Sequence, residues 1–205
     1  MTHLINHRGP LVEAYLKGIN KVIDNALREH ARTIAIRVDL RLPDKSGYSP
    51  SHLADLDHKV ISRFFASIKS QVASNIKKRR NAGARVHPCT LRYIWVREFN
   101  KDHKEHYHVL LLLNKDTYLF FGSYESDKNA IVNMTRKAWA SALGVDVKLS
   151  RYLVHIPKNP FYILDVNDES FSSVYSDLLY RASYFAKLES KDCSDGNRSF
   201  GCSQR

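Results

Sequence analysis

Two histidines separated by a single residue are the first feature of the sequence that could do chemistry. His106 and His108 open the segment EHYHVLLLLN, and Glu98 lies eight residues before His106. Residues two apart in a β-strand face the same side, so both imidazoles would point together. If the strands on either side of NKDHK form an antiparallel hairpin, Glu98 lies near the same face. Such ligands form a site for a divalent ion, and they suit Mn²⁺ or Zn²⁺ better than Mg²⁺ alone.

The alternative for this pair is a purely structural role, because the chain contains ten histidines and an H-x-H spacing also arises by chance. The context favours an ion. Leu110 and Leu112 share the histidine face and are expected to be buried deeper in the sheet, so the neighbouring imidazoles need a partner or a metal. His103, in the expected turn, could substitute for one of the pair.

A second segment with possible chemistry is LLYRASYFAKLESK, residues 178–191. On an α-helix, Tyr180 and Tyr184 lie one turn apart, opposite the apolar stripe, and Lys187 follows one turn later. A tyrosine hydroxyl with a pKa of about 10 is a poor nucleophile, but a nearby ammonium and a metal-polarised phosphate make attack feasible. The product would be a phosphotyrosine ester. The alternative is that both rings pack against another helix. The apolar stripe comprises Phe171, Val174, Leu178, Ala182 and Phe185.

The helices that would position these residues show apolar side chains at spacings of three and four. Four are predicted: one that begins at Pro10, one over roughly residues 56–80, one that follows a cap at Ser126 or Asp127 and ends before Gly144, and one over residues 171–189.

The strands show alternation instead. Residues 33–42 alternate apolar and polar side chains, and CTLRYIWVREF and EHYHVLLLLN are extended segments that would form the hairpin. Shorter extended pieces are expected at VDVKL and RYLVHIP. Leaving the first helix aside, the order strand, helix, strand, strand, helix, strand is the ferredoxin-like arrangement, a central antiparallel sheet covered by helices on one face. The predicted fold class is α+β.

Length and composition indicate the domain organisation and the cellular location. A chain of 205 residues with 43% hydrophobic residues is expected to form one domain over residues 1–190, followed by a flexible polar tail over 191–205. No apolar run has the length of a membrane span, and the start of the chain shows no secretory signal. Three cysteines without a disulfide or zinc pattern indicate a reducing compartment, so a cytoplasmic location is expected.

A net charge of +11 favours a polyanionic partner such as nucleic acid. Tyr93 or Trp95 could stack on bases. The alternative is that the basic residues at the helix end are simply solvated and that Trp95, like Trp139, belongs to the core. The candidates to contact the DNA backbone are basic residues on the predicted strands and helices, namely Arg92, Arg97, Lys77, Lys78, Arg79, Arg80, Arg136 and Lys137.

The two sets of residues, the histidine pair with Glu98 and the tyrosine helix with Lys187, together resemble those of the HUH endonucleases. Within them, the sequence is similar to rolling-circle replication initiators of filamentous and related phages and prophages, in particular the inovirus-type family named after the YagK/YfjJ prophage proteins. The matching stretches are YIWVREFN, HYHVLLLLN, LVHIPKNPFY and YRASYFAKLESK. The resemblance covers most of the chain apart from both ends, and it implies the HUH endonuclease fold.

The resemblance also implies roles for individual residues. His106 and His108 would bind the divalent cofactor, Mn²⁺ or Mg²⁺, with Glu98 as third ligand. Tyr184 would be the principal nucleophile. Tyr180 would serve as the second nucleophile, and Lys187 would steady the phosphate or tyrosinate.

The implied reaction nicks single-stranded or hairpin origin DNA, leaving a 5′-phosphotyrosine and a free 3′-hydroxyl for a polymerase, and a second attack reseals the displaced strand. The chain has no P-loop of the form GxxxxGK[ST], so unwinding would come from a host helicase in the cytoplasm of a bacterial cell. Two alternatives remain at this point. One is a non-catalytic origin- or promoter-binding protein of a mobile element, and the other is a relaxase or transposase with the same chemistry.

Overall fold

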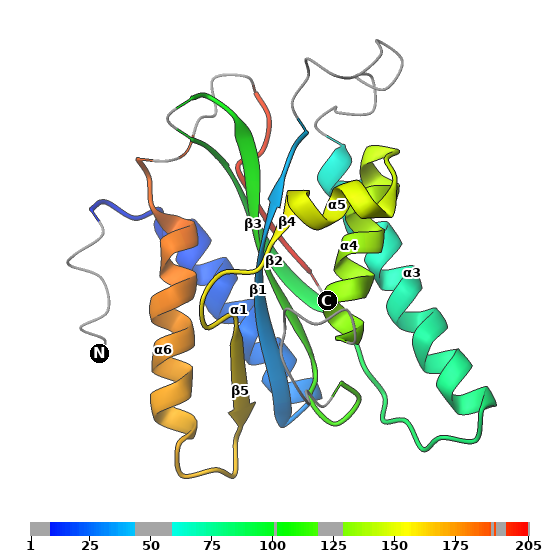
Figure 1. The fold of residues 1–205 in the computed structure, drawn as a ribbon. Coiled ribbons are helices and arrows are strands. Elements are labelled where there is room, and N and C mark those ends of the chain that lie inside the picture. The colour runs from blue at the N-terminus through cyan, green and yellow to red at the C-terminus, as the bar shows by residue number, and fades with distance from the viewer. Residues whose placement is uncertain are drawn as a thin grey trace.

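The computed structural model describes residues 9–43, 59–100, 102–118, 129–189, 191 and 196–204. It has an α+β fold (Figure 1). The α-helices are α1 (Glu13–Glu29), α3 (Val60–Asn81), α4 (Ala130–Leu143), α5 (Val147–Leu153) and α6 (Phe171–Ser183), and a 3₁₀ helix (Tyr184–Ala186) follows α6 directly. The strands are β1 (Arg32–Arg41), β2 (Arg92–Phe99), β3 (Glu105–Asn114), β4 (Val154–His155), β5 (Phe161–Asp165) and β6 (Phe200–Cys202).

The six strands form one antiparallel sheet in the order β4-β1-β3-β2-β6, with β5 also paired to β1. Strands β4 and β5 share one edge of β1: β4 lies opposite Asp39 and Leu40, and β5 lies opposite residues 32–36. The predicted α+β class with an antiparallel sheet is therefore confirmed. β1 and β3 are the long central strands, and both carry residues of the candidate site.

Helices cover both faces of the sheet, so the prediction of helices on one face was wrong. Helices α3 and α4 pack on the face that carries Val38 and Leu111. Helices α1 and α6 pack on the opposite face, which carries Leu110 and Leu112 (Figure 1). As a result, β1 is buried on both sides over residues 33–38. The predicted burial of the leucines that share the histidine face is confirmed.

The ends of the helices differ in places from the prediction. The third predicted helix, α4, begins after Asn129, whose side-chain oxygen accepts hydrogen bonds of 3.1 Å from the backbone N–H groups of Ile131 and Val132. A cap at Ser126 or Asp127 was therefore wrong, and those two residues lie outside the described part of the chain. The start predicted near residue 56 for the second helix also lies outside it.

One extended segment of the prediction is helical. The segment VDVKL contributes to α5, because the side chain of Asp146 accepts a hydrogen bond of 2.7 Å from the backbone N–H of Lys148 and caps the helix. The two valines favour a strand by propensity, but the cap and the packing of Leu153 against the core decide the local structure.

The predicted flexible tail is wrong at residues 200–202, which form strand β6 against β2. Gly201 lies flat on the indole of Trp95, where a Cβ would come within 2.6 and 2.7 Å of ring carbons. A strand of three residues has no visible periodicity, so sequence patterns could not identify it. Across the described residues, no helix is both long and apolar enough to cross a membrane.

Candidate metal centre and nucleophile

The β2–β3 hairpin brings the three predicted ligands together. Glu98 pairs directly with His106 in the strand register, and His108 follows two residues later on the same face. Each of the three offers a ligand atom, and these atoms all lie within 4.8 Å of one another. Glu98 and His108 are buried, whereas His106 is half-buried. The turn residue His103 is exposed with φ of 54° and is not part of this cluster.

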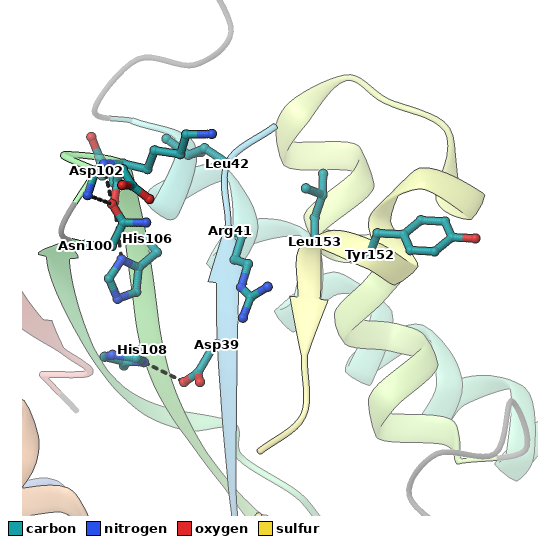
Figure 2. A pocket seen from close by; sticks show the side chains of 11 residues that line it. Asp39, Arg41, Leu42, Asn100, Asp102, His106, His108, Tyr152 and Leu153 are labelled. Carbon is teal, nitrogen blue, oxygen red and sulfur yellow. Dashed lines mark hydrogen bonds and ion pairs between the residues drawn. The ribbon is translucent and has the colours of Figure 1, made fainter. Parts of the chain in front are cut away.

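Asp39 on β1 is a member of the site that sequence reasoning missed. It lies opposite His108 in the β1–β3 register, and its Oδ1 is 2.5 Å from His108 Nδ1 (Figure 2). Because a carboxylate only accepts, the shorter contact with Asp39 requires a hydrogen on Nδ1, so Arg37 Nη2, a donor 3.1 Å from the same nitrogen, does not bond to it. Nε2 faces Glu98 Oε2 at 3.2 Å. Arg37 Nε donates to the same Asp39 oxygen at 3.3 Å. The available signal was the alternation in RVDLR, which puts Arg37 and Asp39 on one face of a strand.

The charges of the cluster shift the pKa values of its members in different directions. Burial acts to raise the pKa of Glu98, but the hydrogen bond with His108 and the ammonium of Lys191 outweigh it and hold this pKa at about 2. Burial acts to lower the pKa of His108, but Asp39 and Glu98 outweigh it and raise this pKa. Burial and the nearby His108 lower the pKa of His106. A cation that binds His108 Nε2 must therefore displace a proton.

A second lysine, Lys191, lies against the cluster in addition to the predicted Lys187. The Lys191 ammonium forms an ion pair with Glu98 Oε1, and both side chains are 3% exposed. Helix α6 ends at Ser183, so Lys187 has an extended backbone with ψ of 126° and does not lie one helical turn after Tyr184. Its ammonium pairs with Glu189 at 2.6 Å. The predicted helix end at residue 189 was thus wrong, but the charge of Lys187 still acts to lower the pKa of Tyr184, as its predicted role requires.

Tyr184 lies against His108 of the cluster. Its ring lies edge-on to the His108 ring with centroids 5.7 Å apart, and the Arg37 guanidinium lies 5.5 Å from its ring centre. Burial raises the pKa of the Tyr184 hydroxyl, and the charge of Glu98 adds to the rise. Tyr180, one turn earlier in α6, is 44% exposed. The predicted apolar stripe is buried at Leu178, Ala182 and Phe185, while Phe171 and Val174 pack partly buried against the same core.

The histidines open into a cleft of about 600 Å³ at the end of the sheet where β1 stops (Figure 2). Asp39, His106 and His108 form its inner wall, and Arg41 and Lys104 line it closer to solvent. Tyr152 belongs to the far rim, where its ring is directed away from the histidines (Figure 2). The cluster is therefore accessible from one side while Glu98 stays buried.

Comparison with known proteins assigns the family. Residues 1–203 match the family described as the YagK/YfjJ C-terminal domain. The chain belongs to this family. It is 38% identical over 200 residues to the uncharacterized protein YfjJ of Escherichia coli (strain K12), which covers 96% of each chain. It is 37% identical over 192 residues to the uncharacterized protein YagK of the same organism, covering 93% of this chain and 92% of YagK. No solved structure matches it significantly.

In this member of the YagK/YfjJ family, the predicted strand residues for DNA contact have structural partners. Arg92 is 5% exposed and forms a two-pronged ion pair with Glu29 at 2.5 and 3.0 Å. Arg97 is 3% exposed and lies 4.0 Å from Glu105. Such buried guanidinium groups cannot reach a phosphate backbone, so both assignments are corrected to structural roles.

The proposed stacking rings are also unsuited to that role. Tyr93 stacks on Phe65 with centroids 3.7 Å apart, and Trp95 is 7% exposed beneath Gly201. Both rings lie on the face covered by α3, opposite the histidine face. Tyr93 and Trp95 are an odd number of residues from Glu98 in β2, so their side chains point to the opposite side of the sheet. They belong to the core of the YagK/YfjJ fold.

The basic residues on α3 and α4 lie in the helical layer on the other side of the sheet from the cluster. Lys77, Lys78, Arg80 and Lys137 are exposed, and Arg136 is half-buried. Arg79 is half-buried and donates to the carbonyl oxygen of Thr117 at 2.7 Å. The exposed members remain candidates for a general attraction to nucleic acid, at a distance from the histidines.

Proposed function

We propose that this chain is a metal-dependent endonuclease of the HUH type, which nicks and joins single-stranded DNA through a 5′-phosphotyrosine intermediate. The observation that carries the proposal is the contact of the Tyr184 ring with His108, inside the cluster that Glu98 and His106 complete. A tyrosine, two imidazoles and a carboxylate are the groups that a metal-assisted attack on a phosphodiester requires.

The strand arrangement supports the finer fold assignment. The chain order β1, α3, β2, β3, α4, β4 combined with the sheet order β4-β1-β3-β2 is what a ferredoxin-like βαββαβ unit would give. The histidine pair lies on the central strand β3, where both neighbours, β1 and β2, contribute a carboxylate. We therefore propose an HUH endonuclease fold extended by α1, β5 and β6.

The donor set fits a divalent ion. His106, His108 and Glu98 would hold Mn²⁺ or Mg²⁺, and the hydrogen bond from His108 to Asp39 is the outer contact that histidine ligands usually make. A bound ion would polarise the scissile phosphate and, as added positive charge, favour the phenolate of Tyr184.

The residues of the chain have the following tasks in the proposed reaction. The Tyr184 oxygen attacks phosphorus, the bond from phosphorus to the 3′ oxygen breaks, and the phosphate stays on Tyr184. The phenol proton leaves to solvent, and the departing oxygen takes up a proton to become a 3′-hydroxyl. Arg37 acts to lower the pKa of Tyr184 and so opposes the effect of burial. Tyr180 is proposed for the second attack that reseals the strand.

The proposed setting is the replication of a phage, prophage or satellite element in a bacterial cytoplasm. The free 3′-hydroxyl would serve a host polymerase, and a host helicase would unwind the duplex. Origin DNA in single-stranded or hairpin form is the proposed partner, because a phosphate held against the cluster must be free of a complementary strand to bend into the cleft.

Covalent capture of DNA tests the function. Single-stranded oligonucleotides labelled at the 3′ end, which together tile the DNA on both sides of the gene, are incubated with the protein and Mn²⁺. We expect a labelled adduct that survives denaturation, is lost after protease treatment and is absent in EDTA.

A matched pair of tyrosine variants controls the assay. Tyr184→Phe should abolish the adduct, while Tyr175→Phe should keep it, because Tyr175 packs α6 on α1 and bonds Asp24 at 3.2 Å. Tight DNA binding without any adduct would instead favour an origin- or promoter-binding protein that does not cleave.

A further inference from the structure

Arg41 is the last residue of β1 and lies beside the candidate metal centre. It pairs with His106 in the β1–β3 register, so it lies on the same face of the sheet as that ligand. It lines the cleft together with His106 and His108. In Figure 2 the Arg41 side chain lies near the end of β1, between the two imidazoles on one side and Leu153 on the other.

The other arginines on the strands have carboxylate partners. Arg32 pairs with Asp116 at 2.7 Å and Asp165 at 3.0 Å. Arg37 pairs with Asp39 at 3.3 Å. As described above, the arginines of β2 pair with Glu29 and Glu105. The guanidinium groups of Arg37, Arg92 and Arg97 are thus buried in ion pairs, and that of Arg32 is paired at the surface.

Arg41 differs from them. Its side chain is exposed, and among the residues that the structure describes its guanidinium has no hydrogen bond and no ion pair. Its backbone is nevertheless fixed, because its carbonyl oxygen accepts a hydrogen bond of 2.9 Å from the buried indole of Trp139. The chain thus holds the base of this side chain in place and leaves its charged end available to a ligand.

The charges around Arg41 indicate what that ligand is. At the inner end of the cleft, Asp39 is paired with Arg37, and Glu98 is paired with Lys191. Nearer to solvent, Asp102, Glu105 and Lys104 also line the cleft, and Glu105 lies 4.0 Å from Arg97. A divalent ion at the histidines together with Arg41 would therefore leave an excess of positive charge at the inner end. The planar fork of a guanidinium matches two oxygens of a phosphate.

We propose that Arg41 binds a backbone phosphate of single-stranded DNA next to the scissile phosphate, and so fixes the direction in which the strand crosses the cleft. The inference rests on the proposed function for its substrate class. It adds a phosphate-binding position at the β1 end of the cleft, and it predicts a contact that is independent of base sequence.

A binding assay that involves no cleavage tests this position. A fluorescein-labelled single strand of about 20 nucleotides, enough to span one binding site, is titrated with protein in Mn²⁺, and all proteins carry Tyr184→Phe so that no covalent product forms. Arg41→Gln, Arg41→Lys and Arg85→Gln are compared. Arg85 is the matched control, because it is exposed and lies in the segment between α3 and β2, away from the residues that line the cleft.

We expect Arg41→Gln to raise the Kd about tenfold, as loss of one charge-assisted contact would, and Arg85→Gln to change it less than about twofold. Arg41→Lys keeps the charge without the fork, so its Kd should lie between the two. The slope of log K against log salt should become shallower by about 0.7 in Arg41→Gln, the value for one phosphate contact on a single strand.

Equal affinities of the Arg41→Gln and Arg85→Gln proteins would overturn the proposal, as would an unchanged salt slope. Because the assay needs no nick, its outcome is separate from that of the proposed function. If wild type forms the covalent adduct but Arg41→Gln binds normally, only the phosphate position fails. If no adduct forms but the Arg41 effects are found, the proposed phosphate contact is upheld in a protein that binds DNA without cleaving it.

Discussion

The hydrogen bond between Asp39 and His108 sets the orientation of one candidate ligand. With Nδ1 donating to the carboxylate at 2.5 Å, Nε2 is the nitrogen that faces Glu98 and the ion site. Outer partners of this kind fix the tautomer and raise the basicity of a metal-binding imidazole.

Replacing this carboxylate tests its role. Asp39→Asn should weaken Mn²⁺ binding by about 10- to 100-fold, the usual effect of losing such an outer partner, as measured by calorimetric titration. Asp102→Asn is the matched control, since Asp102 is exposed in the same cleft and should leave the affinity unchanged. Similar losses in the two variants would mean that only the overall negative charge of the cleft matters.

The two lysines that follow Tyr184 in the chain, Lys187 and Lys191, should behave differently. Lys191→Met removes one partner of a buried ion pair, and we expect the free energy of unfolding in urea to fall by about 3 kcal/mol. Lys187→Met breaks an exposed pair with Glu189, which solvent screens, and should leave the free energy of unfolding nearly unchanged. Comparable effects of both substitutions would contradict the assignment of Lys191 to the interior of the site.

Glu98, which the hydrogen bond with His108 and the charge of Lys191 hold in its ionised form, gives a pH dependence with a definite sign. The pKa of Glu98 falls from 4.5 to about 2 on folding, so its stabilising effect is complete above pH 4.5 and is lost as the pH falls towards 2. In EDTA, the loss of stability between about pH 6 and pH 3 should be larger in wild type than in Lys191→Met. Urea unfolding at both pH values measures this, and equal losses would show that Lys191 does not hold the Glu98 charge.

The sequence predicted that the three candidate ligands converge because their positions follow from two local rules, strand alternation and a short turn. It could not predict Asp39 or Lys191 in the same way. Asp39 reaches His108 only because β1 pairs with β3, which is a contact between segments distant along the chain. Lys191 reaches Glu98 only because α6 stops at Ser183, and helix ends are poorly marked when no glycine or proline follows.

At the scale of elements, the end of α6 decides the geometry of the candidate site. A 3₁₀ turn over Tyr184–Ala186 and an extended Lys187 replace the last helical turn. The extended part is held by residues that precede α1: Val12 N–H donates to the Ala186 carbonyl at 2.8 Å, and Leu188 N–H donates to the Pro10 carbonyl at 3.0 Å. The segments at both ends of the chain therefore fix the tyrosine against β3.

Strand β6 offers a direct test of the ordered C-terminal segment. Gly201→Ala should lower the free energy of unfolding by about 1–3 kcal/mol, the range for overpacking, because the new methyl group would press on the buried Trp95 ring. Gln204→Ala, an exposed change two residues beyond β6, should have little effect. Thermal and urea unfolding measure both, and an unchanged stability of Gly201→Ala would mean that β6 does not pack on Trp95 in solution.

Helices and strands were predicted correctly where a long segment shows apolar periodicity. The predictions failed in short segments, where contacts with other parts of the fold decide the local structure. The long helices α1 and α3 and the hairpin strands follow from their patterns. The segment VDVKL became helical through the Asp146 cap, and β6 became a strand only through its neighbour β2. The second helical layer could not be foreseen, because a strand that is buried on both faces can still alternate: Arg37 and Asp39 are polar but pair with each other.

At the scale of the molecule, the sheet separates two chemical environments. The face covered by α1 and α6 ends in the cluster, Tyr184 and the cleft, whereas the exposed basic residues at the end of α3 belong to the other layer (Figure 1). A net charge of +11 favours a general attraction to DNA. In the part of the chain that the structure describes, the cleft places Arg41 beside the candidate cation site, and Tyr184 contacts His108 of that site. We therefore expect the chemistry to be confined to one end of the sheet.

The most direct test of the central claim is to locate the DNA on the protein. The adduct formed with Mn²⁺ is digested with nuclease and protease, and mass spectrometry identifies the peptide that carries the remaining nucleotide. The proposed mechanism predicts a phosphodiester on Tyr184 in the wild type, formed with Mn²⁺ and not in EDTA. A nucleotide attached elsewhere in a protein whose Tyr184 is unmodified, or an adduct that forms equally in EDTA, would contradict it.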